Sequence, residues 1–219
     1  MFSQEIINML IRGVGESLYM TLVSTFFGYV LGLPMGILLT ISDKNGIKPN
    51  AVLYRILDVI ANLFRSIPFL ILLVLLIPFT KLIVGKSYGS TAIIVPLVIA
   101  AAPYIARMVE SSLNEVDPGV IEAARSMGTS NFTIVTKVML VEARTSLIVG
   151  MTITLGTILG YSAMAGTVGA GGLGDIAIRY GYYRYESGIM IVTVVLLVVL
   201  FQVFQTIGMK LSARLDKRK

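Results

Sequence analysis

Apolar residues in this chain gather into long stretches without charge, and these alternate with short polar segments. Five stretches stand out: Ser17–Ser42, Ser66–Thr80, Ser87–Ala106, Thr145–Gly174 and Ser187–Met209. A helix needs about 20 apolar residues to cross a bilayer core. Four stretches reach that length, and the second reaches it if Lys81 snorkels and the helix continues to Gly85. The pattern predicts an all-α polytopic membrane protein with five transmembrane helices.

The fourth stretch is long enough for one span plus an extracytoplasmic glycine-rich segment. In that segment Gly169, Gly171 and Gly174 match the G-x-G-x-x-G pattern of dinucleotide sites. The pattern has that meaning only between a strand and a helix of a βαβ unit. Because it follows a membrane span here, we expect the glycines to allow tight turns in an extracytoplasmic or re-entrant segment.

Composition agrees with a membrane protein. Hydrophobic residues make up 56% of the chain and charged residues 14%, and the mean hydropathy is +0.86. A soluble chain of 219 residues could not bury that much apolar surface, so we expect one transmembrane domain over residues 1–219. The absence of cysteine and histidine excludes disulfides and histidine-based metal sites. No G-x-x-x-x-G-K-[ST] motif is present, so ATP is not expected to bind to this chain.

Lysine and arginine are distributed unequally between the two predicted sides of the membrane. One side carries Lys44, Lys48, Arg55, Arg65, Arg107, Arg125, Lys137, Arg144, Lys210, Arg214, Lys217, Arg218 and Lys219, and the other carries Arg12, Lys81, Lys86, Arg179 and Arg184. Positive residues favour the cytoplasmic side. The N-terminus is therefore predicted outside and the C-terminus in the cytoplasm. The net charge of +6 then indicates topology and contact with anionic lipid, with no nucleic-acid partner.

Small residues and prolines mark the predicted spans. Gly28, Gly32 and Gly36 lie four residues apart, which places them on one helix face that a second helix can approach closely. Gly156 and Gly160 repeat the spacing in the fourth span. Four prolines are expected to kink or break spans, with the freed backbone groups satisfied by neighbouring protein or water: Pro34, Pro78, Pro96 and Pro103.

The predicted spans contain no carboxylate and no arginine. Carriers coupled to protons or sodium ions generally place charged groups or unwound polar helices near the membrane midplane. Their absence argues against ion coupling within this chain. Energy must then come from another subunit, or the protein is an ATP-independent channel or secondary carrier.

A polar segment lies between the third and fourth spans. Asp117-Pro118 has the form of a helix start, with a capping carboxylate followed by proline at the first helical position. Gly128 has the form of a helix stop, and Thr129 or Ser130 can cap a second short helix running toward Lys137. Two capped polar helices between spans indicate a structure that a partner grips from outside the bilayer.

Glu122-Ala123-Ala124 followed by three residues and Gly128 resembles the EAA-x3-G motif of permease subunits in binding-protein-dependent ABC importers. The family motif continues with nine residues and I-x-L-P, where this chain has Val138, Leu140 and Val141. Other segments are similar to methionine-importer permeases, and the resemblance covers roughly residues 10–210: Arg65–Phe69, Ile77–Thr80, Ala102–Glu110, Gly160–Met164 and Val168–Gly174.

The resemblance implies a type I ABC importer permease fold in a bacterial cytoplasmic membrane. Such permeases are homodimers with five spans per subunit and coupling helices, here at about residues 117–138. Two separate ATPase subunits bind ATP and magnesium, so this chain needs no cofactor and is not an enzyme by itself. An extracytoplasmic lipid-anchored binding protein delivers the methionine. Another amino acid or small nutrient is the alternative substrate.

Roles for individual residues follow from their chemistry together with the motif. Ala123 and Ala124 are small enough for a partner groove to close on the helix. Glu122 and Arg125 lie one turn apart and can pair with each other or reach partner groups. Gly128 is expected in a left-handed turn that fixes the angle between the two short helices.

The translocation path is predicted along the fourth and fifth spans, with Tyr161, Ser162 and Met164 as candidate gate residues. Met164 stands among the small residues Ala163, Ala165 and Gly166. Its flexible apolar side chain can form a plug against its copy across a two-fold axis. A packing or lipid-facing methionine is the alternative.

Overall fold

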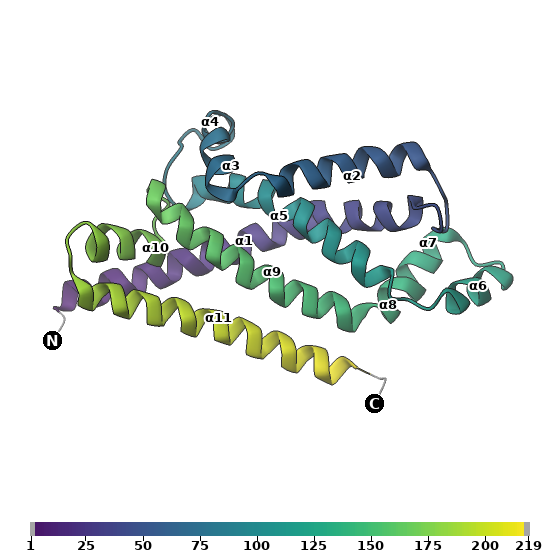
Figure 1. Cartoon of the computed structure of the whole chain (residues 1–219). Coiled ribbons are helices and arrows are strands. Elements are labelled where there is room, and N and C mark those ends of the chain that lie inside the picture. Colours follow the sequence, from purple (N-terminus) through teal and green to yellow (C-terminus); the bar gives the residue numbers. More distant parts are fainter. Residues whose placement is uncertain (1–2, 217–219) are drawn as a thin grey trace.

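The computed structural model describes residues 3–216, which form a bundle of helices (Figure 1). Lys217, Arg218 and Lys219 of the predicted basic tail lie outside the described residues. The elements in chain order are α1 (Gln4–Ser42), α2 (Ala51–Ser66), α3 (Phe69–Leu75), α4 (Ile77–Val84), α5 (Ser90–Leu113), α6 (Pro118–Ser126), α7 (Asn131–Thr133), η1 (Ile134–Met139), α8 (Leu140–Glu142), α9 (Arg144–Ala165), η2 (Gly166–Val168), α10 (Gly172–Ile176), η3 (Ala177–Tyr182) and α11 (Ser187–Leu215).

Within residues 3–216, four helices are long and apolar enough to cross a membrane: α1, α5, α9 with η2, and α11. They correspond to four of the five predicted spans. α1 begins upstream of its charge-free stretch, where Arg12 and Glu16 form an ion pair one turn apart. α5 continues past Ala106 to Leu113. Because α9 ends at Ala165 and tight turns follow, the fourth stretch holds one span and a glycine-rich segment, as predicted.

The second predicted span, residues 66–85, is wrong as a single helix. α2 ends at Ser66, and α3 and α4 are separated at Leu76. The axis of α3 is bent by 102° from that of α2. Ile67 has an extended ψ of 124°, because a residue that precedes proline disfavours the helical region. Counted together, α2 and α3 form one broken span, which brings the candidate spans within the described residues to five.

The start of this broken span also corrects the predicted loop. Arg55 and Arg65, predicted on the cytoplasmic side between the first two spans, belong to the helix α2 and not to a loop. Figure 1 shows α2 lying along α1 and α5, and the three helices are in contact. The true connection between α1 and α2 is short and lies between Ser42 and Ala51.

The glycine face of α1 packs on α5, as its spacing predicts. A Cβ atom at Gly32 would lie 2.6 Å from the Ala102 carbonyl oxygen, and one at Gly28 would lie 2.9 Å from the Ile105 side chain. A Cβ atom at Gly156 would lie 2.5 Å from the ring of Phe201 on α11. Gly160 is different, because no atom of the described chain outside its own helix neighbourhood lies within 4 Å of such a Cβ. The glycine prediction therefore holds for α1 and for half of the pair on α9.

The prolines act less uniformly than predicted. Pro34 lies inside α1, and Pro96 and Pro103 lie inside α5, where the helices continue through them. Pro78 lies in the first turn of α4, where its missing N–H has no helical partner to lose. Helix breaks therefore occur where proline lies at the boundary of an element, and α1 and α5 continue through their internal prolines.

The polar segments lie at the two ends of the bundle. In Figure 1, α6 projects at one end, close to where α1 ends and α2 begins. α10 and η3 lie near the opposite end, beside the beginning of α1 and of α11. The bundle therefore has two surfaces on which a partner outside the membrane can bind.

Candidate coupling segment and translocation path

The helix α6 is built as its sequence predicts. Asp117 accepts a hydrogen bond from the Gly119 N–H at 2.7 Å, and Pro118 occupies the first helical position. Gly128 has a φ of +74°, the left-handed conformation that glycine adopts without steric cost. The helix is capped at both ends by local interactions, so it can keep its shape while projecting from the bundle.

A second short helical segment follows the turn, again as predicted. The hydroxyl of Ser130 accepts a hydrogen bond from the Thr133 N–H at 3.3 Å and caps α7. The segment then continues as π-helical η1, which packs on α6. Ile134 and Met139 of η1 are buried, and they anchor the two short helices to the core of the bundle.

The motif residues divide between an exposed and an attached face of α6. Glu122 and Ala123 are exposed, while Ala124 is buried in the core. Arg125 donates a hydrogen bond to the backbone carbonyl of Ile47, in the connection between α1 and α2. Among the described residues no ion pair joins Arg125 to Glu122, so the arginine attaches α6 to its own chain and leaves the glutamate open to a partner.

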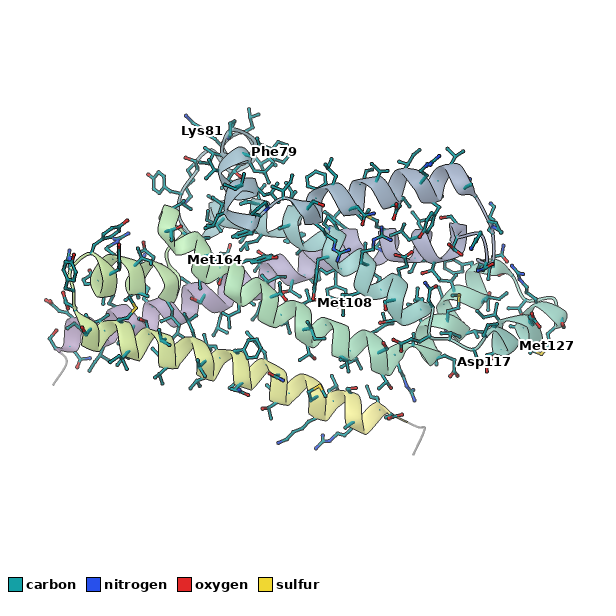
Figure 2. All side chains as sticks on the ribbon, viewed as in Figure 1. Phe79, Lys81, Met108, Asp117, Met127 and Met164 are labelled. Atoms are coloured by element: carbon teal, nitrogen blue, oxygen red, sulfur yellow. The ribbon has the colours of Figure 1, made fainter. Side chains whose placement is uncertain are left out.

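A polar cavity of about 500 Å³ lies behind α6. Tyr54 of α2 and Glu110 of α5 line it from the bundle, and Glu122 and Arg125 line it from α6. Met127 lies on the outer side of the segment and is 78% exposed (Figure 2). Arg125 thus attaches the C-terminal part of α6 to the bundle, and the cavity between α6 and the bundle leaves space for the helix to move.

A cluster of charged side chains joins α2 to α5, and sequence reasoning missed it. The polar cluster consists of Tyr54, Asp58, Asn62, Arg107 and Glu110. The guanidinium of Arg107 pairs with Asp58 and with Glu110, the latter at 2.7 Å. The side chains of Arg107 and Glu110 are only 18% and 11% exposed. The prediction that no span carries a buried carboxylate or arginine is therefore wrong.

The polar cluster escaped detection because α2 is amphipathic rather than uniformly apolar. Tyr54, Asp58 and Asn62 recur every four residues and face α5. The opposite face of α2 is apolar and exposed, including Val52, Val59 and Leu63. A search for charge-free stretches rejects such a helix, whereas the spacing of four residues between polar positions would have revealed it.

The predicted gate residues lie together on the last turns of α9, in different surroundings. The ring of Tyr161 stacks on Phe69 of α3, with centroids 4.5 Å apart and planes 3° apart. Ser162 is buried and donates to the Leu159 carbonyl of its own helix at 2.8 Å. Met164 is 49% exposed on the last turn of α9 (Figure 2). Of the three, Met164 presents its side chain most freely to a second molecule.

The glycine-rich segment turns back on itself at the end of the bundle opposite α6 and forms, with α10, a hairpin over residues 169–176 (the α10 hairpin). Gly169, Gly171 and Gly172 all have positive φ, so the segment turns as its composition predicts. The Gly172 N–H donates to the Glu16 carboxylate at 2.8 Å, and the Leu173 N–H donates to the Ser17 hydroxyl at 2.9 Å. These bonds fix α10 on α1. Within residues 3–216, no group of three or more acidic, histidine or cysteine side chains is placed to hold a metal ion.

The family described as "Binding-protein-dependent transport system inner membrane component" matches residues 19–218. The chain belongs to this family. The probable D-methionine transport system permease protein MetI of Vibrio cholerae is 50% identical over 96% of this chain and 94% of its own length. The D-methionine permease MetI of Escherichia coli K12 is 55% identical over 75% of this chain and 76% of its own. The resemblance to methionine-importer permeases is confirmed.

Solved structures agree with this assignment. A chain from the inward-facing MetNI methionine ABC transporter has a TM-score of 0.97 and 51% identity, covering 99% of this chain and 100% of that one. A chain of an amino acid ABC transporter solved with histidines has a TM-score of 0.74 at 22% identity, which shows a shared fold. The type I importer permease fold is confirmed, and α6 lies between the third and fourth spans as expected.

Proposed function

We propose that this protein is the transmembrane permease subunit of an ATP-driven importer for methionine. The observation that carries the proposal is the capped helix α6, which presents Glu122 and Ala123 outside the bundle in a chain that matches D-methionine permeases over nearly its whole length. ATP and magnesium bind to two separate ATPase subunits. Transport proceeds by alternating access, with α6 as the coupling helix.

The coupling role follows from the geometry of α6. A groove of the ATPase closes over Ala123, and the exposed Glu122 meets a polar or basic group there. Arg125 holds the helix to the α1–α2 connection, and Gly128 sets the angle to α7. Because both caps are local, the short helix moves as a rigid body when the ATPase closes.

The path runs between two copies of this chain, with the end of α9 facing the two-fold axis. Met164 is exposed at that place and closes the path by contact with its copy, since a methionine side chain repacks readily. Tyr161 is stacked on Phe69 and supports the turn that carries Met164, and Ser162 holds the same turn through its bond to Leu159.

The orientation places α6 in the cytoplasm and the α10 hairpin outside. The N-terminus then lies outside and the C-terminus inside, which agrees with the excess of lysine and arginine toward the α6 side. A methionine-binding lipoprotein docks on the outer surface, and anionic lipid contacts the basic residues of the cytoplasmic side.

Co-purification with the ATPase of the same operon tests the coupling role. The wild-type chain should retain the ATPase, whereas Glu122→Arg and Gly128→Pro should lose it, because the first reverses the exposed charge and the second cannot adopt a positive φ. Glu5→Arg is a matched control, since Glu5 is an exposed carboxylate in the first turn of α1, far from α6. Failure of the well-folded wild type to bind the ATPase would favour a channel or secondary carrier.

Uptake by vesicles that contain the full complex tests the substrate. Labelled methionine should accumulate only with ATP and with the binding protein present. Accumulation of a different amino acid in place of methionine would contradict the substrate and leave the importer mechanism intact.

A further inference from the structure

The charged groups of the polar cluster each have a partner on their own helix. On α5, Arg107 pairs with Glu110 at 2.7 Å, three residues away. On α2, the Asn62 amide donates to the Asp58 carboxylate at 3.1 Å, four residues away. Bonds between the helices are added to these: Arg107 to Asp58, Arg107 to Asn62 at 3.1 Å, and Tyr54 to Glu110 at 3.4 Å.

This arrangement lowers the cost of separating the two helices. Removing the only partner of a buried charge is strongly destabilising, because the charge that remains is neither solvated nor paired. Here α2 can leave α5 while Arg107 keeps Glu110 and Asp58 keeps Asn62. The polar cluster therefore supports two discrete arrangements, closed as observed and open. A well-packed apolar contact would offer no such second arrangement.

The polar cluster is also connected to α6. The connection that leads into α2 is bound to the end of α1, with the Lys48 N–H donating to the Ile41 carbonyl at 3.0 Å and the Asn50 N–H to the Ser42 carbonyl at 2.9 Å. Arg125 of α6 binds the carbonyl of Ile47 in this connection. Displacement of α6 is thereby passed to the start of α2 at Ala51, three residues before Tyr54.

We propose that the polar cluster is a latch that holds α2 on α5 in the observed state and opens when the coupling helix α6 is displaced. Arg107 is the positioning residue of this latch, because its guanidinium spans carboxylates on both helices at once. The proposal rests on the coupling role of α6 proposed above. The cavity of about 500 Å³ between Glu110 and Arg125 gives the moving parts room.

Arg107→Lys distinguishes a latch that opens during transport from a contact that only stabilises the fold. Lysine keeps the charge and can pair with Glu110, so the chain should still fold and bind the ATPase. A single ammonium does not replace the planar fork that reaches both helices, so the closed arrangement is weakened. Arg55→Lys is the matched control, since Arg55 is an exposed arginine of α2, the helix that Arg107 contacts, and lies outside the polar cluster.

The distance between α2 and α5 is the direct readout. Spin labels at Val59→Cys and Ser111→Cys, both exposed, can be attached cleanly because the chain has no cysteine. Labelled copies are diluted with unlabelled ones, and the distance is measured in the complex without nucleotide and with ATP trapped by vanadate. The wild type and Arg55→Lys should show a short distance without nucleotide and a longer one when trapped.

Arg107→Lys should show the longer distance in both states, and methionine uptake per ATP hydrolysed should fall roughly tenfold, which is a typical coupling factor between sites. An unchanged α2–α5 distance between the two wild-type states would overturn the latch while leaving ATPase binding and uptake as evidence for the importer. Loss of ATPase binding by the wild type would instead contradict the proposed function. Identical behaviour of Arg107→Lys and wild type would also overturn the latch.

Discussion

Gly15 and Gly32 lie on the same helix, α1, and differ in what surrounds them. A Cβ atom at Gly32 would lie 2.6 Å from the Ala102 carbonyl oxygen and 2.8 Å from the Ile105 Cβ, both on α5. A Cβ atom at Gly15 meets no atom of the described chain within 4 Å. The absence of a side chain is therefore required by packing at Gly32, whereas at Gly15 it only lowers the stability of the helix.

Gly32→Ala should destabilise the protein by about 2 kcal/mol, because backbone atoms of α5 must move to admit the methyl group. Gly15→Ala should leave stability unchanged or raise it slightly, since alanine favours the helix more than glycine does. Thermal unfolding of the purified protein in detergent measures both. Equal melting temperatures for the two variants would mean that α1 and α5 are not packed as closely as described.

Among the helices, proline and glycine mark ends that follow from local sterics, whereas whether successive helices form one span depends on tertiary contacts. The break at Ile67-Pro68 follows from local sterics, yet whether α2 and α3 are one span could not be read from the sequence. α2 was missed because its charges disqualify it as an apolar stretch. Of those charges only Asp58 meets α5, where it pairs with Arg107, whereas Arg55 and Arg65 are exposed.

Two side chains of the distant helix α1, Glu16 and Ser17, accept hydrogen bonds from the start of α10. Glu16→Ala leaves the Gly172 N–H without its acceptor, which should destabilise the hairpin locally by about 1–3 kcal/mol. Amide hydrogen exchange in residues 172–176 should become faster. Arg12→Ala is the control: it removes the exposed ion pair to Glu16 but keeps the acceptor, so exchange should stay nearly unchanged. Faster exchange in both variants would show that the ion pair itself holds the hairpin.

For the whole molecule, the arrangement places α6 and the α10 hairpin at opposite ends of the bundle (Figure 1). The distribution of lysine and arginine predicts which end faces the cytoplasm. Arg55 and Arg65 lie in α2, and Lys44, Lys48, Arg125 and Lys137 lie in the connections and short helices at the α6 end. Orientation therefore stays a prediction that one experiment decides.

Cysteine labelling gives the orientation directly, since the native chain has none to interfere. Met127 beside α6 is 78% exposed, and Tyr185 after η3 is 86% exposed. In intact cells, with the outer membrane made permeable, an impermeant maleimide should label Tyr185→Cys at once. Met127→Cys should react only after the inner membrane is opened. The reverse pattern would invert the topology and contradict a cytoplasmic coupling helix.

Features that depend on near neighbours in the chain could be predicted from the amino-acid pattern alone. Apolar runs specified four of the spans, and Asp117, Pro118 and Gly128 specified α6 with its caps, since a cap or a positive φ is a local property. Contacts between residues far apart in the chain became visible only in the folded molecule. These contacts join Arg125 to Ile47, place Glu16 on Gly172, and pair Arg107 with Asp58 across two helices. A charge inside a membrane protein is stable only when its partner is in place, and no local pattern states where the partner is.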